Sequence, residues 1–219
     1  MFISGDINEE KTGYIIDKLK KINRRDIKNI QTTDVDRHVS KIKEVTEEMN
    51  VNQAKLSIGF RTNIKPNSEN YYKLMLYNSI LGGGIHSKLF QNVREKNGMA
   101  YYVFSRLEKF KGLMVISSGI EISNRDKAYD VIVKQLEDMK NGNISDYEFE
   151  SSIKSIETGI KSLKDSQLQI VDFNLSQMIA GTKDSPDDII EKVKKVTRQD
   201  VMDIAKYIEM DTVYFLTSK

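Results

Sequence analysis

The sequence predicts an α+β fold, a layered arrangement in which a largely antiparallel sheet has helices packed on one side. The strand-like segments Gln53–Phe60, Tyr101–Phe110 and Leu113–Ile120 lie in the first 120 residues and are rich in apolar and aromatic side chains. A short turn at Lys111-Gly112 joins the last two, which predicts an antiparallel pair. The rest of the chain is mainly helical in its periodicity.

Composition excludes several classes of function. The chain has 219 residues and a formal net charge of +2, which gives no electrostatic case for a nucleic-acid partner. It has no Cys, so disulfides, thiolate zinc sites and a thiol nucleophile are excluded. No apolar run approaches the roughly 20 residues of a membrane helix, and the opening MFISGD lacks the pattern of a signal peptide. We expect a cytoplasmic protein without a membrane partner.

The first 36 residues predict a small strand–helix unit followed by a linker. Phe2–Ser4 is predicted as a strand, and Asp6 or Asn8 can cap a helix over Glu9–Ile22. Residues 26–36 lack periodicity, as a linker does. A chain that opens directly with a strand suggests a fragment of a longer protein.

The next segments predict the sheet and its first helix. Lys41–Glu47 and Gln53–Phe60 are predicted strands that a hairpin connection at residues 49–52 joins. A helix is expected over Tyr71–Leu81. The unbroken apolar run Leu113–Ile116 predicts a strand that is covered on both faces.

Helix starts in the second half are marked by four capping-box patterns, in which Ser or Thr precedes an acidic residue by three positions. They are Ser123/Asp126, Ser145/Glu148, Ser185/Asp188 and Thr197/Asp200. The segment Tyr147–Ile179 is too long for a typical helix, so we expect a break near Lys164–Gln167. Thr212–Thr217 is the last predicted strand.

The stretch Leu81–Ser105 is where we expect the functional site. Gly82, Gly83 and Gly84 interrupt a helical pattern, although each Gly in a helix interior costs about 1 kcal/mol relative to Ala. The backbone there must therefore turn sharply or approach something closely, and we predict that these three glycines contribute to substrate binding. A short helix restarts at Ser87 and ends at Gly98, which places Arg94 near the strand that begins at Tyr101. A guanidinium and a phenol at one junction suit a carbonyl oxygen or a developing oxyanion.

Nucleotide and metal sites are disfavoured. Ser87 stands where a phosphate-binding loop or a dinucleotide fingerprint needs its next glycine. His38 and His86 are single residues without a carboxylate at helical ligand spacing, and the motifs His-x-x-Glu-His and His-Glu-x-x-His are absent. We expect no metal and no cofactor in this chain.

A purely structural interpretation of Arg94 and Tyr101 competes with the functional one. Arg94 would be a surface residue paired with Glu95 or Glu108, and Tyr101 a core residue at a strand start. Alternation along a strand puts Tyr101 and Tyr102 on opposite faces. Periodicity alone favours this structural interpretation.

A family resemblance reverses that preference. The residues from Leu81 to Tyr101 follow the pattern LGGG-x-x-S-x-LF-x-x-x-REK-x-G-x-AY. With the flanking QAKLSIGFRTN and AYYVFSRLEKFKG, the pattern resembles the second half of the pitrilysin/insulinase zinc peptidases, the inverzincins. It looks most like the companion subunits of bacterial two-subunit members, and the resemblance runs from about Val51 to the end.

The resemblance implies a fold like one half of a mitochondrial processing peptidase, and residues 36–219 would form that C-terminal domain. Residues 1–35 would be the trailing strand–helix unit of the preceding domain plus a linker. Arg94 and Tyr101 would hold the scissile carbonyl of a peptide opposite a zinc site in another domain or chain. The implied partners are the metal-bearing half and a peptide, in a dimer. Two alternatives stay open: an inactive peptide-binding or scaffolding subunit, and a structural interaction domain.

Overall fold

A five-stranded sheet is the centre of the fold in the computed structural model, which describes residues 2–23, 35 and 37–219. Its strands lie in the order β1-β5-β2-β4-β3. They are β1 (Lys43–Met49), β2 (Ala54–Arg61), β3 (Ala100–Glu108), β4 (Leu113–Ile120) and β5 (Glu209–Ser218). Only the β1/β5 pair is parallel, so the prediction of a largely antiparallel sheet is confirmed. The predicted hairpin of the first two strands is wrong, because β5 lies between β1 and β2.

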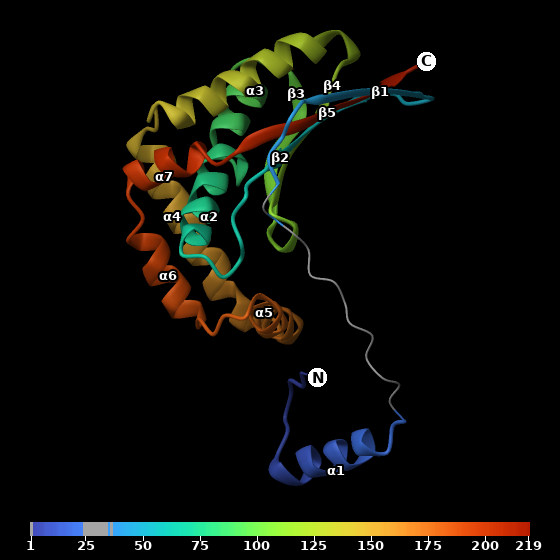
Figure 1. Cartoon of the computed structure of the whole chain (residues 1–219), viewed down its shortest axis with the longest axis vertical. Coiled ribbons are helices and arrows are strands. Elements are labelled where there is room, and N and C mark those ends of the chain that lie inside the picture. The colour runs from blue at the N-terminus through green and yellow to red at the C-terminus, as the bar shows by residue number, and fades with distance from the viewer. Residues whose placement is uncertain (1, 24–34, 36) are drawn as a thin grey trace.

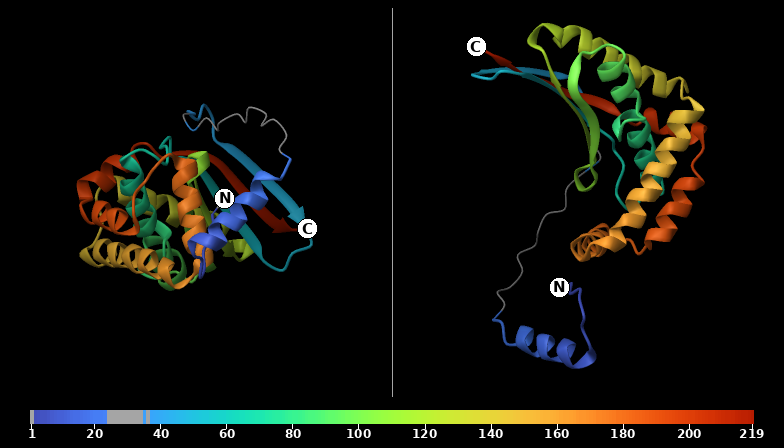
Figure 2. Two further views of the ribbon diagram at one scale, coloured as in Figure 1. Left: turned by 90° about the horizontal axis from the view of Figure 1, so that it is seen from below. Right: turned by 180° about the vertical axis from the view of Figure 1, so that it is seen from behind.

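Helices cover one face of this sheet, as predicted (Figure 1 and Figure 2). They are α2 (Asn70–Gly82), α3 (Arg125–Lys140), α4 (Asp146–Lys161), α5 (Gln167–Ala180), α6 (Pro186–Lys194) and α7 (Arg198–Ala205). Alternate residues of β2 are fully buried toward them, with Leu56, Ile58 and Phe60 in one core with Leu76 and Ile80 of α2. None of the helices in the described part of the chain is long and apolar enough to cross a bilayer.

The expectation that β4 is covered on both faces is wrong. Met114 and Ile116 are fully buried, whereas Leu113 and Val115 between them are partly exposed. The apolar run therefore alternates like any half-covered strand, because the helices pack on one face only. Its outward residues line an open sheet face.

Three of the four predicted capping boxes form. The hydroxyl oxygens of Ser145, Ser185 and Thr197 each accept a hydrogen bond from the backbone N–H three residues later, and the acidic side chain there accepts one from the backbone N–H of the cap residue. At Ser123 the box is absent, because residues 122–124 form a 3₁₀ turn and α3 starts after Asn124. The predicted break is confirmed: a 3₁₀ turn at Ser162–Asp165 separates α4 from α5.

The first 23 residues differ partly from expectation. Phe2–Ser4 forms no strand, since no described strand lies beside it to pair with. Helix α1 (Glu9–Lys20) forms with Asn8 as its cap. It buries none of its side chains and stands apart from the layered body (Figure 1). The predicted linker, residues 26–36, lies outside the described residues except for Val35, so the division at residues 35/36 stays a prediction.

Candidate functional site

The end of helix α2 packs unusually closely on strand β3. A Cβ on Gly82 would lie 2.4 Å from the backbone nitrogen of Ser105, and one on Gly83 would lie 2.6 Å from the Cα of Ser79. Gly82 is thus needed for packing, because no larger residue fits between α2 and β3, whereas a side chain on Gly83 would clash with the preceding turn of α2 itself. A Cβ on Gly84 would meet the ring of His86 at 3.1 Å.

The short helix after the glycine run is confirmed, but it is π-helical over Phe90–Glu95. Single π turns are frequent at functional sites. Val93 is fully buried, whereas the side chain of Arg94 is 43% exposed. The chain then reverses: the Gly98 N–H donates to the Arg94 carbonyl at 2.9 Å and the Met99 N–H to the Val93 carbonyl at 3.0 Å. This turn brings the backbone of Arg94 to the start of β3.

Tyr101 lies at a β-bulge, and this decides its exposure. The register between β3 and β4 shifts between Ala100 and Tyr102. Because of that extra residue, both Tyr101 and Tyr102 are exposed, to 61% and 37%. The alternation that put the two tyrosines on opposite faces fails here, and a core position for Tyr101 is wrong.

Arg94 and Tyr101 both lie at this junction. Among the contacts of the described residues, no hydrogen bond and no cation–π contact joins the two side chains. The Arg94 Cζ lies 4.8 Å from the centroid of the Phe90 ring, and its Nε lies 3.8 Å from Glu95 Oε1. The Glu95 pairing of the structural interpretation is therefore present, whereas Glu108 pairs with Arg106. The Tyr101 hydroxyl has no partner among the described side chains and backbone groups.

An aromatic platform on the open sheet face adjoins Tyr101. The rings of Tyr102 and Phe104 stack with centroids 5.9 Å apart. The ring of Tyr102 lies over Gly119 of β4, where a Cβ would be 2.4 Å from Tyr102 Cε1. This pair was not predicted, although a spacing of two residues along one strand places both rings on the same face.

A buried ion pair connects the short helix to α4. The Lys88 ammonium lies 3.1 Å from both Glu148 carboxylate oxygens and donates to the Asn143 carbonyl at 2.5 Å. Both side chains are nearly buried, and Glu148 also closes the capping box at Ser145. The capping pattern could identify Glu148, but nothing in the sequence pairs it with Lys88.

Neither histidine forms part of a metal site. His86 is buried, and that burial lowers the pKa of its imidazole, against a hydrogen bond with the Ser79 backbone and the charge of Glu148. His38 is exposed and its Nδ1 lies 2.9 Å from Glu209 Oε1. Over residues 2–23, 35 and 37–219 no group of three His, Cys, Asp or Glu side chains could hold a metal ion. The described residues therefore do not fit a zinc ion.

The fold and this junction define a peptidase-like domain whose described residues form no cluster of metal ligands. Residues 1–156 match the family model described as "Peptidase M16 inactive domain", which covers well over half of the chain. The chain therefore belongs to the inactive-domain family of the M16 peptidases, and the resemblance found in the sequence is confirmed.

Individual relatives support this family assignment. The chain is 35% identical to "Probable inactive metalloprotease YmfF" of Bacillus subtilis (strain 168), over 99% of this chain and 50% of that protein. It is 26% identical to "Uncharacterized zinc protease YmxG" of the same organism, over 75% of this chain and 41% of the relative.

Among solved structures, a conserved protein from Enterococcus faecalis V583 superposes with a TM-score of 0.87 at 28% identity, covering 98% of this chain and 51% of that one. The peptidase M16 inactive domain from Pseudomonas fluorescens gives a TM-score of 0.80 at 18% identity, over 98% and 52% of the two chains, and shows the shared fold. The predicted fold class is thereby confirmed, and the chain spans half the length or less of the two curated relatives.

Proposed function

We propose that this chain is the substrate-binding half of a zinc-dependent endopeptidase, and that the zinc site lies in another domain or chain. The observation that carries the proposal is the position of Tyr101, exposed in the bulge of β3 beside the turn that holds Arg94. A free phenol and a half-exposed guanidinium are the donors that a peptide carbonyl needs as negative charge develops on its oxygen.

Both side chains are free to change partner. The ion pair of Arg94 with Glu95 is solvent-exposed, and such pairs contribute only about 0–1 kcal/mol. A peptide carbonyl can therefore compete for the guanidinium at small cost. The Tyr101 hydroxyl gives up no hydrogen bond within the described structure. The attacking group must come from the partner half, because the described side chains provide no metal site.

The free edge of β3 supports peptide binding. In the described sheet β3 pairs only with β4, so its other edge has unpaired backbone groups. A peptide that adds to this edge as a strand gains backbone hydrogen bonds without strong demands on its sequence. Gly82, Gly83 and Gly84 belong to the proposed site: Gly82 lets α2 end directly against β3, and the other two form the turn that leads from α2 to the short helix.

A second candidate function is peptide binding or scaffolding without cleavage. The name of the relative YmfF, "Probable inactive metalloprotease", favours it, since that relative is similar to nearly the whole of this chain. We further propose that the chain works in the cytoplasm as a dimer with its metal-bearing half.

Two measurements test these functions. Fluorescence anisotropy with a labelled peptide library tests binding by the chain alone, and Tyr101→Phe should weaken it. Peptide hydrolysis after addition of the metal-bearing half separates the two candidates: cleavage supports the endopeptidase, whereas binding without cleavage supports the scaffold. A chain that neither binds peptide nor supports cleavage would contradict both.

A further inference from the structure

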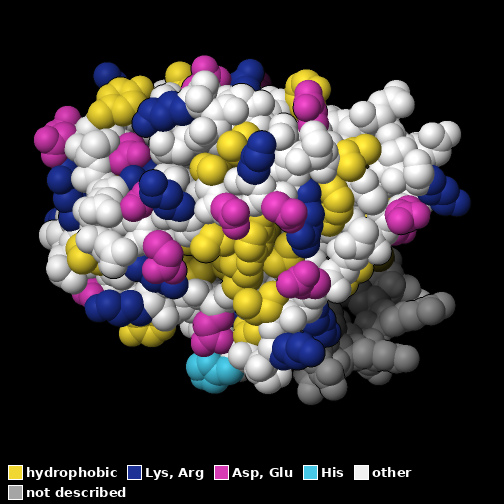
Figure 3. Space-filling view, turned by 90° about the horizontal axis from the view of Figure 1, so that it is seen from above, with side chains coloured by type: hydrophobic (Ala, Val, Ile, Leu, Met, Phe, Trp, Pro, Cys, Tyr) yellow, Lys and Arg dark blue, Asp and Glu magenta, His cyan; other side chains and the backbone are white. Residues whose placement is uncertain are grey.

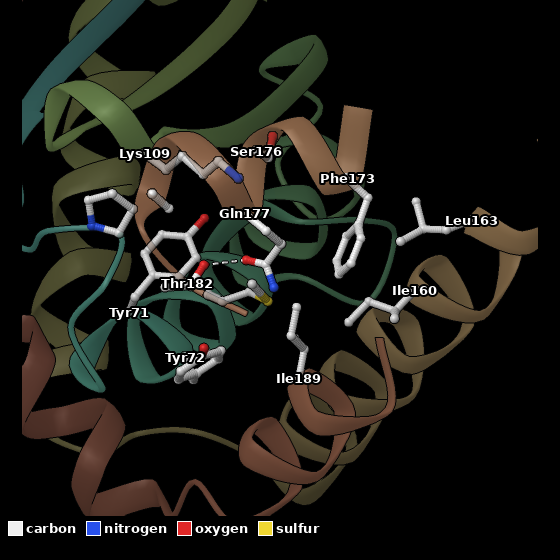
Figure 4. A pocket seen from close by; sticks show the side chains of 13 residues that line it. Tyr71, Tyr72, Lys109, Ile160, Leu163, Phe173, Ser176, Gln177, Thr182 and Ile189 are labelled. Carbon is white, nitrogen blue, oxygen red and sulfur yellow. Dashed lines mark hydrogen bonds between the residues drawn. The ribbon is translucent and has the colours of Figure 1, made fainter. Parts of the chain in front are cut away.

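A cavity of about 160 Å³ lies at the other end of helix α2, between α2, α4, α5 and α6 (Figure 4). Its walls are mostly apolar. The larger apolar residues of the lining are Pro66, Met75, Ile160, Leu163, Phe173 and Ile189. Tyr71 in the cavity and Gly82 are eleven residues apart in one helix, which corresponds to about 16 Å along its axis. The cavity is therefore separate from the proposed peptide site.

Three polar side chains of the lining have no hydrogen-bond or ion-pair partner among the described residues, and they gather on one side of the cavity (Figure 4). No carboxylate of the described chain lies within ion-pair distance of the Lys109 ammonium, whose contact is the ring of Phe110 at 4.9 Å. The hydroxyls of Tyr71 and Ser176 make no hydrogen bond with a described residue.

The other polar side chains of the lining, by contrast, have hydrogen-bond partners within the protein. The Thr182 hydroxyl donates to Gln177 Oε1 at 2.5 Å, and the Gln177 amide donates to the Asp184 carbonyl. The Tyr72 hydroxyl donates to the Asp184 carboxylate, which also pairs with Lys192 at 2.7 Å.

Partial burial makes the charged form of the Lys109 ammonium unfavourable. It lowers the pKa of Lys109 and raises the pKa of Tyr71 to about 12, so the phenol stays a hydrogen-bond donor at neutral pH. A half-buried ammonium without a counter-ion is stabilised by an anion that reaches it. A tail that fills the apolar walls would add the free energy of burying apolar surface.

We propose that this cavity binds a small carboxylic acid with an apolar tail, its carboxylate accepting hydrogen bonds from Lys109 Nζ and the Tyr71 hydroxyl. The ligand chemistry goes beyond the proposed peptidase role and does not depend on it. A free fatty acid and the C-terminus of a peptide ending in an apolar residue both present this chemistry.

Titration of the 219-residue chain with sodium octanoate, followed by NMR of isotope-labelled methionine methyl groups, tests the proposal. The Met75 methyl lines the cavity and should shift, whereas the Met114 methyl in the sheet core should not. Octanol, which has the same tail without the charge, should bind more weakly. N-acetyl-leucine, a mimic of a peptide C-terminus, distinguishes the two sources of carboxylate.

Lys109→Met should weaken octanoate binding by about 10- to 100-fold, as expected for loss of a charged hydrogen-bond partner. Lys111→Met removes an exposed lysine from the same turn and should leave affinity unchanged. A thermal melt of each variant verifies folding, and Tyr71→Phe gives an independent loss of one donor. Unchanged affinity in folded Lys109→Met, or no shift of the Met75 methyl with either carboxylate, would overturn the proposal.

Discussion

Gly82 lies so close to Ser105 that a Cβ on the glycine would be 2.4 Å from the serine backbone nitrogen. This contact holds the end of α2 on β3, and it is the physical reason for a glycine where helix propensity disfavours one. The contacts of Gly82, the turn at Gly98 and the bulge at Tyr101 together set the geometry of the junction.

Gly82→Ala should destabilise the domain by about 1–3 kcal/mol, the usual cost of overpacking. Urea denaturation measures the free energy of unfolding. Gly159→Ala is the matched control, because Gly159 is an exposed residue of α4 and a Cβ there meets nothing within 4 Å. It should stabilise by about 0.5–1 kcal/mol. Equal effects of the two changes would refute the packing argument.

The buried pair Lys88–Glu148 should be far more sensitive than a surface pair. Lys88→Met leaves a nearly buried carboxylate without its cation, and we expect a loss of about 3–5 kcal/mol in the free energy of unfolding. Lys161→Met removes an exposed partner of Glu157 and should cost less than about 1 kcal/mol. A small loss for Lys88→Met in the same urea titration would show that water reaches the pair.

His86 should make the stability of the domain depend on pH. Burial lowers its pKa in the folded state below the ordinary value of 6.5, so the unfolded chain binds the proton more readily. Stability should therefore fall as the pH drops from about 7.5 to about 5.5, where an ordinary histidine titrates. In urea midpoints at the two pH values, His86→Gln should flatten this change, whereas His38→Gln should preserve it. An undiminished slope in His86→Gln would assign the effect to other groups.

Helix α1 should exchange its amide hydrogens rapidly in a monomeric sample. A helix of 12 residues that buries no side chain has little to stabilise it in water. We expect much lower protection over residues 9–20 than over β4, whose inward residues are fully buried. Equal protection of both segments in a demonstrated monomer would contradict the interpretation of α1 as part of a neighbouring domain.

Local signals in the sequence predicted the elements well and their contacts poorly. The capping residues Ser145, Ser185 and Thr197 and the ends of β4 were predicted correctly, because each depends on neighbours within a few residues. The same pattern at Ser123 failed, since a 3₁₀ turn preceded the helix.

The junction itself depends on long-range structure. The exposure of Tyr101 follows from a bulge against β4, and the burial of Lys88 from Glu148, 60 residues later. Neither feature can be predicted from residues that are close in the sequence. Charge is equally uninformative about a partner: acidic and basic side chains are mixed on the face shown in Figure 3, around an apolar patch.

Arg94→Lys tests the guanidinium of the proposed site. The substitution keeps the charge and loses the planar fork that can hold a carbonyl with two donors. We expect slower peptide hydrolysis by the complex with the metal-bearing half, with an unchanged thermal melt, since the side chain is 43% exposed. Lys96→Arg, on an exposed residue of the same turn, should leave the rate unchanged. Normal turnover in Arg94→Lys would contradict a role for the planar guanidinium in holding the carbonyl.

The most direct test of the proposed function is the turnover of Tyr101→Phe in that reconstituted complex, with Tyr147→Phe as the control on another exposed tyrosine. Tyr101→Phe keeps the ring and removes one donor, so kcat should fall by about 10²–10³-fold if the hydroxyl stabilises the transition state. The melting temperature should be unchanged in both variants. Near-normal turnover of Tyr101→Phe beside an equally active control would contradict the role of Tyr101 in holding the scissile carbonyl.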